Sequence, residues 1–245
     1  YEIPLRLVGS EMCIRDSRLV LDIHGVYKPT GQNRTYPNIV NFESVFGLEE
    51  LKWSNPDMPL YDVTFPFIRM VQGPVDYTPG AYRNATREGF RIDYRNPMSQ
   101  GTRAHQVAAY VVFDAPLVML CDSPTRYMAD EACTRFIASL PVVFDTTRVL
   151  AGEIGEYIVT ARKRQDCWYV GGLTGWTPRT LDVDLSLLDP GREYTATLLA
   201  DDDRSAAEPA RYVLSTQRVT SATRLQIPVA PGGGFALKIE PADNK

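Results

Sequence analysis

The sequence lacks a hydrophobic run of the length that a membrane-spanning helix needs, about 18 residues. Its longest apolar stretch, residues 107–120, is interrupted by Asp114 and Pro116. It also contains no glycine-rich phosphate-binding motif. The formal net charge of −4 gives little attraction for nucleic acid or for an anionic membrane. We therefore expect neither nucleic acid nor a membrane as a partner, and a nuclease or phosphate-binding enzyme is disfavoured.

Cysteines are few and widely spaced. The four are Cys13, Cys121, Cys133 and Cys167, and no two of them form a C-x-x-C pair. This spacing argues against a cysteine metal site and against a dense disulfide framework. One disulfide is possible, but buried free thiols are the favoured interpretation.

Residues 1–17 (YEIPLRLVGSEMCIRDS) have no initiator Met, no signal-peptide layout and no clear hydrophobic period. The stretch GSEMCIRDS resembles translated sequencing-adapter text. We predict that residues 1–17 are a non-native leader and that they pack poorly against the rest of the chain.

The next part of the chain, residues 18–144, alternates short apolar segments with helical patterns. Strands are predicted at residues 18–23, 38–42, 62–70 and 117–121, and helices at 101–114 and 130–140. Strands that alternate with helices and long loops are typical of parallel β/α units. Four such units make half of an eight-stranded (β/α)8 TIM barrel, which is the predicted fold of residues 18–144.

The remainder, residues 145–245, contains strands and turn signals without helices. The seven predicted strands are residues 156–162, 167–172, 179–185, 194–200, 212–215, 223–228 and 235–240. Such a series predicts an antiparallel β-sandwich. The predicted fold class is therefore α/β plus all-β, with a domain boundary near residue 145.

Polar residues follow the predicted strands of the first part, at the end where barrel enzymes carry their chemistry. These residues are His24, Glu43, the loop 73–80 and Asp122. Glu49 comes six residues after Glu43, and at a strand end with its following loop both can turn into one cavity. Two neighbouring carboxylates either repel each other, which raises the pKa of one so that it can donate a proton, or share a cation.

A structural interpretation stays open for each of these residues taken alone. An isolated strand-end glutamate is more often solvated or salt-bridged than catalytic, and His24 alone is more often structural. Their joint placement at the ends of four consecutive strands favours a pocket, although its chemistry is not readable from placement.

Four long stretches resemble a known family. They are HGVYKPTGQNRTYPN, NFESVFGLE, TFPFIRMVQGPVDYTPGAYRN and MSQGTRAHQVAAYVVFDAPLVMLCDSPTRY. They resemble consecutive blocks of glycoside hydrolase family 97, which holds bacterial α-glucosidases and α-galactosidases. The resemblance runs from about Leu19 to beyond Tyr169 and implies that the chain holds barrel strands five to eight and the C-terminal β domain, as a C-terminal fragment.

The resemblance also implies roles for individual residues. Glu49 matches the family's proton donor, and Glu43 matches a ligand of its calcium ion, so that Glu43 and Glu49 together are the predicted metal ligands. His24 matches a histidine beside the sugar in the −1 subsite. Asp76, with Tyr77 and Asp122, lies where it can bind sugar hydroxyls, and Asp76 is the predicted substrate-binding residue among them.

Position 25 distinguishes two branches of the family. Inverting members have a glutamate after the histidine, whereas Gly25 stands here, as in the retaining branch with α-galactosidases. The retaining nucleophile is an aspartate on barrel strand four, before residue 18, and neither Asp16 nor Asp22 matches its motif. The resemblance thus implies a fragment of a calcium-dependent retaining α-glycoside hydrolase that acts on α-linked oligosaccharides and is inactive alone. It implies a periplasmic or secreted location, and leaves galactose versus glucose and the oligomeric state open.

An alternative is a non-catalytic carbohydrate-binding or scaffold protein. The absent nucleophile and the tryptophans Trp168 and Trp176 of the second part motivate it, although Trp168 lies inside an alternating strand and is more simply a core residue. A reading frame that continues upstream into further barrel strands would favour the hydrolase.

Overall fold

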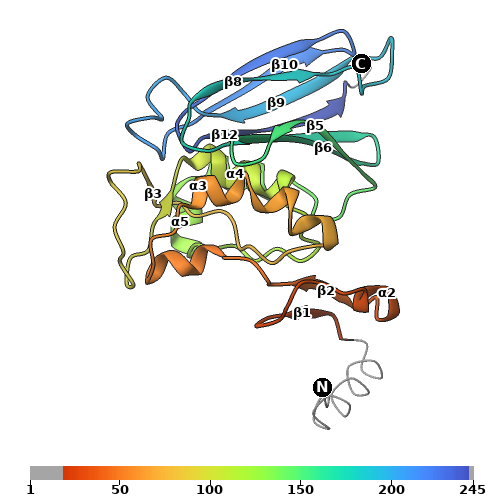
Figure 1. The fold of residues 1–245 in the computed structure, drawn as a ribbon. Coiled ribbons are helices and arrows are strands. Elements are labelled where there is room, and N and C mark those ends of the chain that lie inside the picture. The colour runs from red at the N-terminus through yellow and green to blue at the C-terminus, as the bar shows by residue number, and fades with distance from the viewer. Residues whose placement is uncertain (1–18, 243–245) are drawn as a thin grey trace.

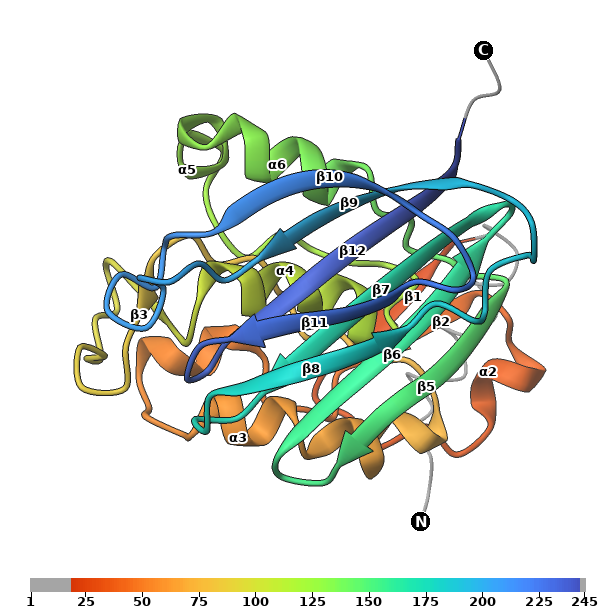
Figure 2. The same cartoon turned by 90° about the horizontal axis from the view of Figure 1, so that it is seen from above.

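The computed structural model describes residues 19–242, so the predicted leader lies outside the described residues. A six-stranded antiparallel sheet dominates the structure (Figures 1 and 2). Its strand order is β10-β9-β12-β7-β6-β5. The bounds are β5 Thr146–Glu153, β6 Tyr157–Arg164, β7 Cys167–Thr174, β9 Tyr194–Ala200, β10 Val213–Val219 and β12 Gly234–Pro241.

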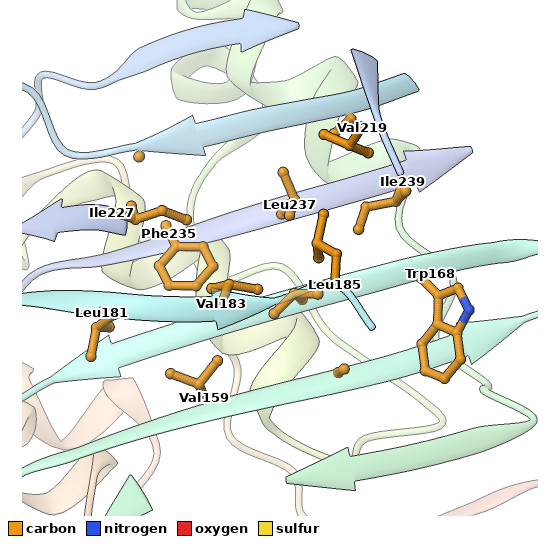
Figure 3. Packing of buried hydrophobic residues seen from close by; sticks show 14 of the residues in the cluster. Val159, Trp168, Leu181, Val183, Leu185, Val219, Ile227, Phe235, Leu237 and Ile239 are labelled. Carbon is orange, nitrogen blue, oxygen red and sulfur yellow. The ribbon is translucent and has the colours of Figure 1, made fainter. Parts of the chain in front are cut away.

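A second antiparallel sheet, of β8 (Arg179–Asp184) and β11 (Arg224–Val229), covers one face of the large sheet. Figure 3 shows the core between them, where Val183 of β8 and Ile227 of β11 lie against Phe235 and Leu237 of β12. Buried and exposed residues alternate along β8, as expected for a strand with one buried face. The predicted sandwich is thus confirmed, and Trp168 is a core residue.

All seven strands predicted in this part are present, and the structure adds β5, which the sequence did not predict. β5 is an edge strand with Val149 exposed, and a β-bulge interrupts its pairing with β6 between Val149 and Ala151. An edge strand with few buried side chains shows no alternation of apolar and polar residues, which explains the omission.

Helix α4 (Arg103–Val112) covers the other face of the large sheet, and all ten of its residues are buried. Thr102 caps it by accepting a hydrogen bond from the His105 amide at 3.1 Å. The helix packs on β6, β7 and β12. It confirms the predicted helix at 101–114, as α6 (Glu131–Ala138) confirms the one at 130–140.

The N-terminal part begins with two parallel strands, β1 (Leu21–Ile23) and β2 (Ile39–Phe42), as predicted. The next segment lies beside β2, because the Asp76 amide donates to the Phe42 carbonyl at 3.2 Å. The segment after α4 follows in turn, because the Val75 amide donates to the Asp114 carbonyl at 2.8 Å. β1, β2, the segment at Asp76 and the segment at Asp114 are therefore neighbours in the same order as in the sequence.

The strand predicted at 62–70 is wrong. These residues form part of α3 (Met58–Asp62) and the 3₁₀ helices η2 (Phe65–Phe67) and η3 (Met70–Gln72). Burial recurs at Met58, Asp62, Phe65 and Arg69, which is a helical spacing. The side chain of Asp57 caps α3, with Pro59 in its first turn.

The strand predicted at 117–121 is also wrong. This segment is irregular, and Leu117, Met119 and Leu120 are exposed rather than buried. Isolated hydrogen bonds, such as that from the Cys121 amide to the Pro79 carbonyl, hold it in place of a ladder. Two of the four predicted barrel strands are therefore present, and a half barrel is not clearly formed in residues 19–144.

The remaining elements are short. They are α2 (Gln32–Thr35), η1 (Leu48–Lys52), β3 (Asn84–Ala85), β4 (Ser99–Gln100) and α5 (Pro124–Ala129). Within residues 19–242, no helix combines the length and the hydropathy needed to cross a bilayer.

Candidate active site

A cavity of about 760 Å³ opens where β1 and β2 end. His24, Glu43, Glu49 and Asp76, the residues predicted to form the site, all line it. His24 follows β1, Glu43 follows β2, Glu49 lies in η1 and Asp76 lies in the segment beside β2. Elements separated by up to 52 residues therefore bring one imidazole and three carboxyl groups to one cavity.

The carboxylate of Glu43 is fixed by the turn that follows β1. Its Oε2 accepts a hydrogen bond from the Gly25 amide at 2.6 Å, and the Glu43 amide donates to the Ile23 carbonyl at 2.9 Å. Gly25 has φ +63°, a conformation that glycine adopts without strain. The glycine that distinguishes this sequence therefore orients its amide toward the predicted metal ligand.

The carboxylate of Glu49 folds back over Gly47. A Cβ atom at position 47 would lie 2.2 Å from Glu49 Oε2, so a larger residue there would displace the flexible carboxylate from this position. Glu49 Oε2 also accepts a hydrogen bond from the Thr78 hydroxyl at 3.3 Å. Glu43 and Glu49 thus line the same cavity, although their roles remain predictions.

His24 lies against a second acidic group, Asp22 with Asp76. His24 Nε2 and Asp76 Oδ2 are 2.5 Å apart, and His24 Nε2 lies 3.9 Å from Asp22 Oδ1. Burial opposes the charge on His24, but the hydrogen bond to Asp76 and the nearby carboxylates outweigh burial, so the pKa of His24 is raised. Burial, followed by the charge of Asp76, raises the pKa of Asp22 to about 6.

Asp22, His24 and Asp76 also form the group of described residues that is arranged for a metal ion, with ligand atoms within 4.8 Å of one another. This group does not include Glu43 or Glu49. Those two glutamates offer the carboxylate oxygens that calcium prefers, and each lines the cavity with an oxygen that accepts a hydrogen bond. Their donor chemistry suits a calcium ion that takes further oxygen ligands.

Other predicted residues have mixed outcomes. Asp122 lines the cavity and accepts a hydrogen bond from the Tyr82 amide at 2.8 Å. Tyr77 instead is a core residue, packed between Phe65 and Phe113 with ring centroids 5.7 and 4.7 Å away, so its predicted contact with sugar is wrong.

The side chain of Arg69 binds backbone carbonyl groups. Its guanidinium donates to the carbonyls of Phe42, Gly73 and Pro74 at 3.0–3.1 Å. It therefore joins the end of β2 to the loop that carries Asp76.

Several residues of the cavity were not predicted. They are Trp53 and the basic residues Lys52, Arg83, Arg95 and Arg126, whereas Thr78 belongs to the predicted loop 73–80. Trp53 follows Glu49 by four residues, and this short distance in the sequence from a predicted site residue could have indicated it. The arginines come from loops far apart in the sequence, and nothing in the sequence indicates that they meet.

Of the cysteines within the described residues, Cys121, Cys133 and Cys167 are free. Cys133 is buried as predicted, but Cys121 is exposed. Cys13 lies outside the described residues.

A sandwich domain that follows a cavity with paired carboxylates is an arrangement typical of glycoside hydrolases, and sequence comparison agrees. Residues 143–240 match the family model described as "Glycosyl-hydrolase 97 C-terminal, oligomerisation". This part of the chain therefore matches the C-terminal domain of glycoside hydrolase family 97, and the resemblance found in the sequence is confirmed.

Two curated relatives extend the similarity over nearly the whole chain. A retaining alpha-galactosidase of Bacteroides thetaiotaomicron is 50% identical over 234 residues, which are 95% of this chain and 35% of the relative. A probable retaining alpha-galactosidase of Streptomyces bingchenggensis is 31% identical over 89% of this chain and 31% of the relative. The chain thus spans about a third of the length of these relatives.

Solved structures show the same relationship. A family 97 enzyme from Pseudoalteromonas sp., in complex with panose, superposes with a TM-score of 0.87 at 27% identity, over 97% of this chain and 37% of that chain. The same enzyme is also solved with acarbose. A beta-arabinopyranosidase shares the fold, with a TM-score of 0.77 at 24% identity.

Proposed function

We propose that this chain is the C-terminal portion of a retaining α-glycoside hydrolase that acts on α-linked oligosaccharides, with α-galactosides as the favoured substrates. The observation that carries the proposal is the placement of Glu43, Glu49, His24 and Asp76 around one cavity. The 50% identity to a protein named as a retaining alpha-galactosidase supports the choice of reaction and sugar.

Glu49 is the proposed general acid and base. In the first step, it gives its proton to the leaving oxygen while a carboxylate attacks the anomeric carbon; in the second, it takes a proton from water, which releases the sugar with retained configuration. We assign the attacking carboxylate to the part of the relatives' length that this chain does not span. His24 and Asp76, hydrogen-bonded to each other, are placed to hold sugar hydroxyls.

Glu43 and Glu49 are the proposed ligands of a calcium ion. When bound, the ion supplies positive charge that holds sugar hydroxyls and stabilises negative charge. The hydrogen bond from the Gly25 amide to Glu43 Oε2 supports the proposal, because it restrains this carboxylate at the cavity.

We further propose that residues 19–144 correspond to the second half of a (β/α)8 barrel. Support comes from the parallel pair β1–β2 and from the segments at Asp76 and Asp114, which follow it in sequence order. The cavity then lies at the carboxyl ends of the strands, as in barrel enzymes. A periplasmic or secreted location is part of the same proposal and rests on the family resemblance.

The test replaces Glu49 with Gln in the complete gene product that contains this chain. A general acid contributes about 10²–10⁴-fold, so hydrolysis of α-galactosides with poor leaving groups should fall by at least about 100-fold. Aryl α-galactosides with acidic leaving groups need little protonation and should lose much less.

The matched control is Glu50→Gln, because Glu50 lies in the same helix and lines the same cavity. It should leave the dependence on the leaving group unchanged. Equal losses for good and poor leaving groups in the Glu49 variant would remove Glu49 from the proposed role.

A further inference from the structure

Two exposed aromatic rings, Trp53 and Tyr94, lie side by side, and Trp53 lines the cavity. The side chain of Trp53 lines the cavity, and the residue is 51% exposed, while Tyr94 is 70% exposed. Their ring centroids are 6.3 Å apart and their planes are tilted by 36°. Large apolar surface left exposed beside a cavity is a mark of a binding site rather than of a core.

Trp53 is oriented despite its exposure. It is the residue at the C-terminal end of η1, the helix that carries Glu49, and its backbone amide donates to the Glu50 carbonyl at 3.2 Å. Its indole Nε1 donates to Glu50 Oε2 at 2.8 Å. The indole and the proposed acid are therefore held by one short helix, with a fixed spacing between them.

Tyr94 lies in a separate loop, which is held by hydrogen bonds to the Asp93 side chain. Asp93 Oδ1 accepts hydrogen bonds from the amides of Arg95 at 3.0 Å and Asn96 at 2.9 Å. Arg95 and Asn96 both line the cavity, and the Tyr94 ring that precedes them lies against Trp53, which also lines it. The two rings thus come from separate loops that the fold brings to one place.

The surroundings of the two rings suit a sugar. The apolar C–H face of a pyranose packs on flat aromatic surfaces, and the amphipathic rings of Trp and Tyr contribute contact area at little cost in conformational entropy. The guanidinium and ammonium groups of Arg83, Arg95 and Lys52 line the same cavity and offer donors for hydroxyls. A volume of about 760 Å³ falls in the range of roughly 300–1,000 Å³ that holds drug-sized ligands, which are larger than one sugar ring.

We propose that Trp53 and Tyr94 form an aromatic platform that binds the leaving-group sugar of an α-linked oligosaccharide. The inference rests on the proposed function. In that function, His24 and Asp76 hold the sugar that is released with retained configuration, and Glu49 protonates the oxygen between the two sugars. The platform acts through binding and takes no part in bond breaking.

Ligand-observed NMR tests the platform on the complete gene product that contains this chain, carrying Glu49→Gln so that turnover is slowed, with galactose and galactosyl-α-1,6-glucose as ligands. The platform predicts that the disaccharide binds more tightly than galactose and that its glucose-ring protons receive saturation from the protein. Trp53→Ala should weaken disaccharide binding by about 3- to 10-fold, the equivalent of an aromatic contact, and leave galactose binding within about 2-fold. Tyr94→Ala should have the same selectivity with a smaller effect.

Tyr27→Ala is the matched control, because Tyr27 is 75% exposed and does not line the cavity. Unfolding temperatures of all variants verify that the fold is intact. The platform alone would be overturned if galactose binds and the Trp53 variant loses no more affinity for the disaccharide than the Tyr27 variant does. A complete gene product that binds neither sugar would overturn the proposed function and the platform with it.

Discussion

Asp22 is the residue whose charge state changes most within the ordinary range of pH. Burial and the neighbouring Asp76 raise its pKa from 3.8 to about 6, so the folded protein holds this proton more tightly than the unfolded chain does. The associated stability is fully present below about pH 4 and is lost as the pH rises through about 6. His24 and Asn41 are the other groups that influence this carboxyl group, and both oppose the shift.

Asp22→Asn should therefore change stability in a pH-dependent way. Asn cannot ionise, so the variant should match the native chain near pH 4 and exceed it above pH 6, by up to about 3 kcal/mol in the free energy of unfolding. Urea unfolding at several pH values measures the difference. Two curves that stay parallel from pH 4 to pH 8 would show that Asp22 has an ordinary pKa.

At the same scale, the sequence indicated the acidic and imidazole groups of the cavity but not their hydrogen bonds. His24 and Glu43 follow strands and Glu49 lies just after Glu43, so strand ends were enough to find them, whereas Asp76 follows the 3₁₀ helix η3, where a strand was wrongly predicted. The partnership of His24 with Asp76 joins residues 52 apart, and only tertiary structure determines it.

Helix α4 is the element that joins the two parts of the chain, and it sits on glycines. A Cβ atom at Gly171 of β7 would lie 2.8 Å from Val111 Cβ and 3.0 Å from the Ala108 carbonyl oxygen. At Gly234 of β12, it would lie 3.1 Å from the Cα of His105. The sheet thus presents backbone, rather than side chains, to the helix.

Gly171→Ala should destabilise the chain by about 1–3 kcal/mol, because the added methyl group forces a packed helix away from its sheet. Thermal unfolding measures this loss. Gly175→Ala is the matched control: its Cβ would meet neighbours at 3.6–3.8 Å, which is ordinary contact, so its unfolding temperature should stay near that of the native chain. A Gly171 variant as stable as the Gly175 variant would contradict this packing.

Elements were predictable from sequence where one face is buried in a regular pattern. β8 and α4 show such patterns, whereas residues 62–70 combine aromatic and β-branched residues, which favour strands, with a helical spacing of buried positions. Residues 117–121 are apolar without being buried. In both segments, local composition pointed to a strand and tertiary contacts decided otherwise.

At the scale of the whole molecule, the hydrophobic core crosses the predicted domain boundary near residue 145. Ile158 and Leu173 of the large sheet belong to one cluster with Ala108 and Val112 of α4. Tyr169, Leu199 and Ala236 belong to a second cluster with residues of α4 and α6. Each part of the chain therefore completes the core of the other.

A chain restricted to residues 143–245 should for this reason be less stable than the full chain. We expect it to unfold at a lower temperature and to bind a hydrophobic dye, because the sheet face beneath α4 is then exposed to water. The full chain should unfold in one transition. Two separate transitions in calorimetry, with the upper one matching that of the isolated segment, would show that the parts are independent.

The close packing of α4 on glycines of the sheet has a consequence for protein engineering. A C-terminal sandwich taken from a related protein would bring different residues to this contact, and a single added methyl group would force its sheet away from the host's α4. Exchange of the sandwich between relatives should therefore succeed when α4 is exchanged with it, so the suitable junction lies before residue 103 rather than at the apparent boundary about forty residues later.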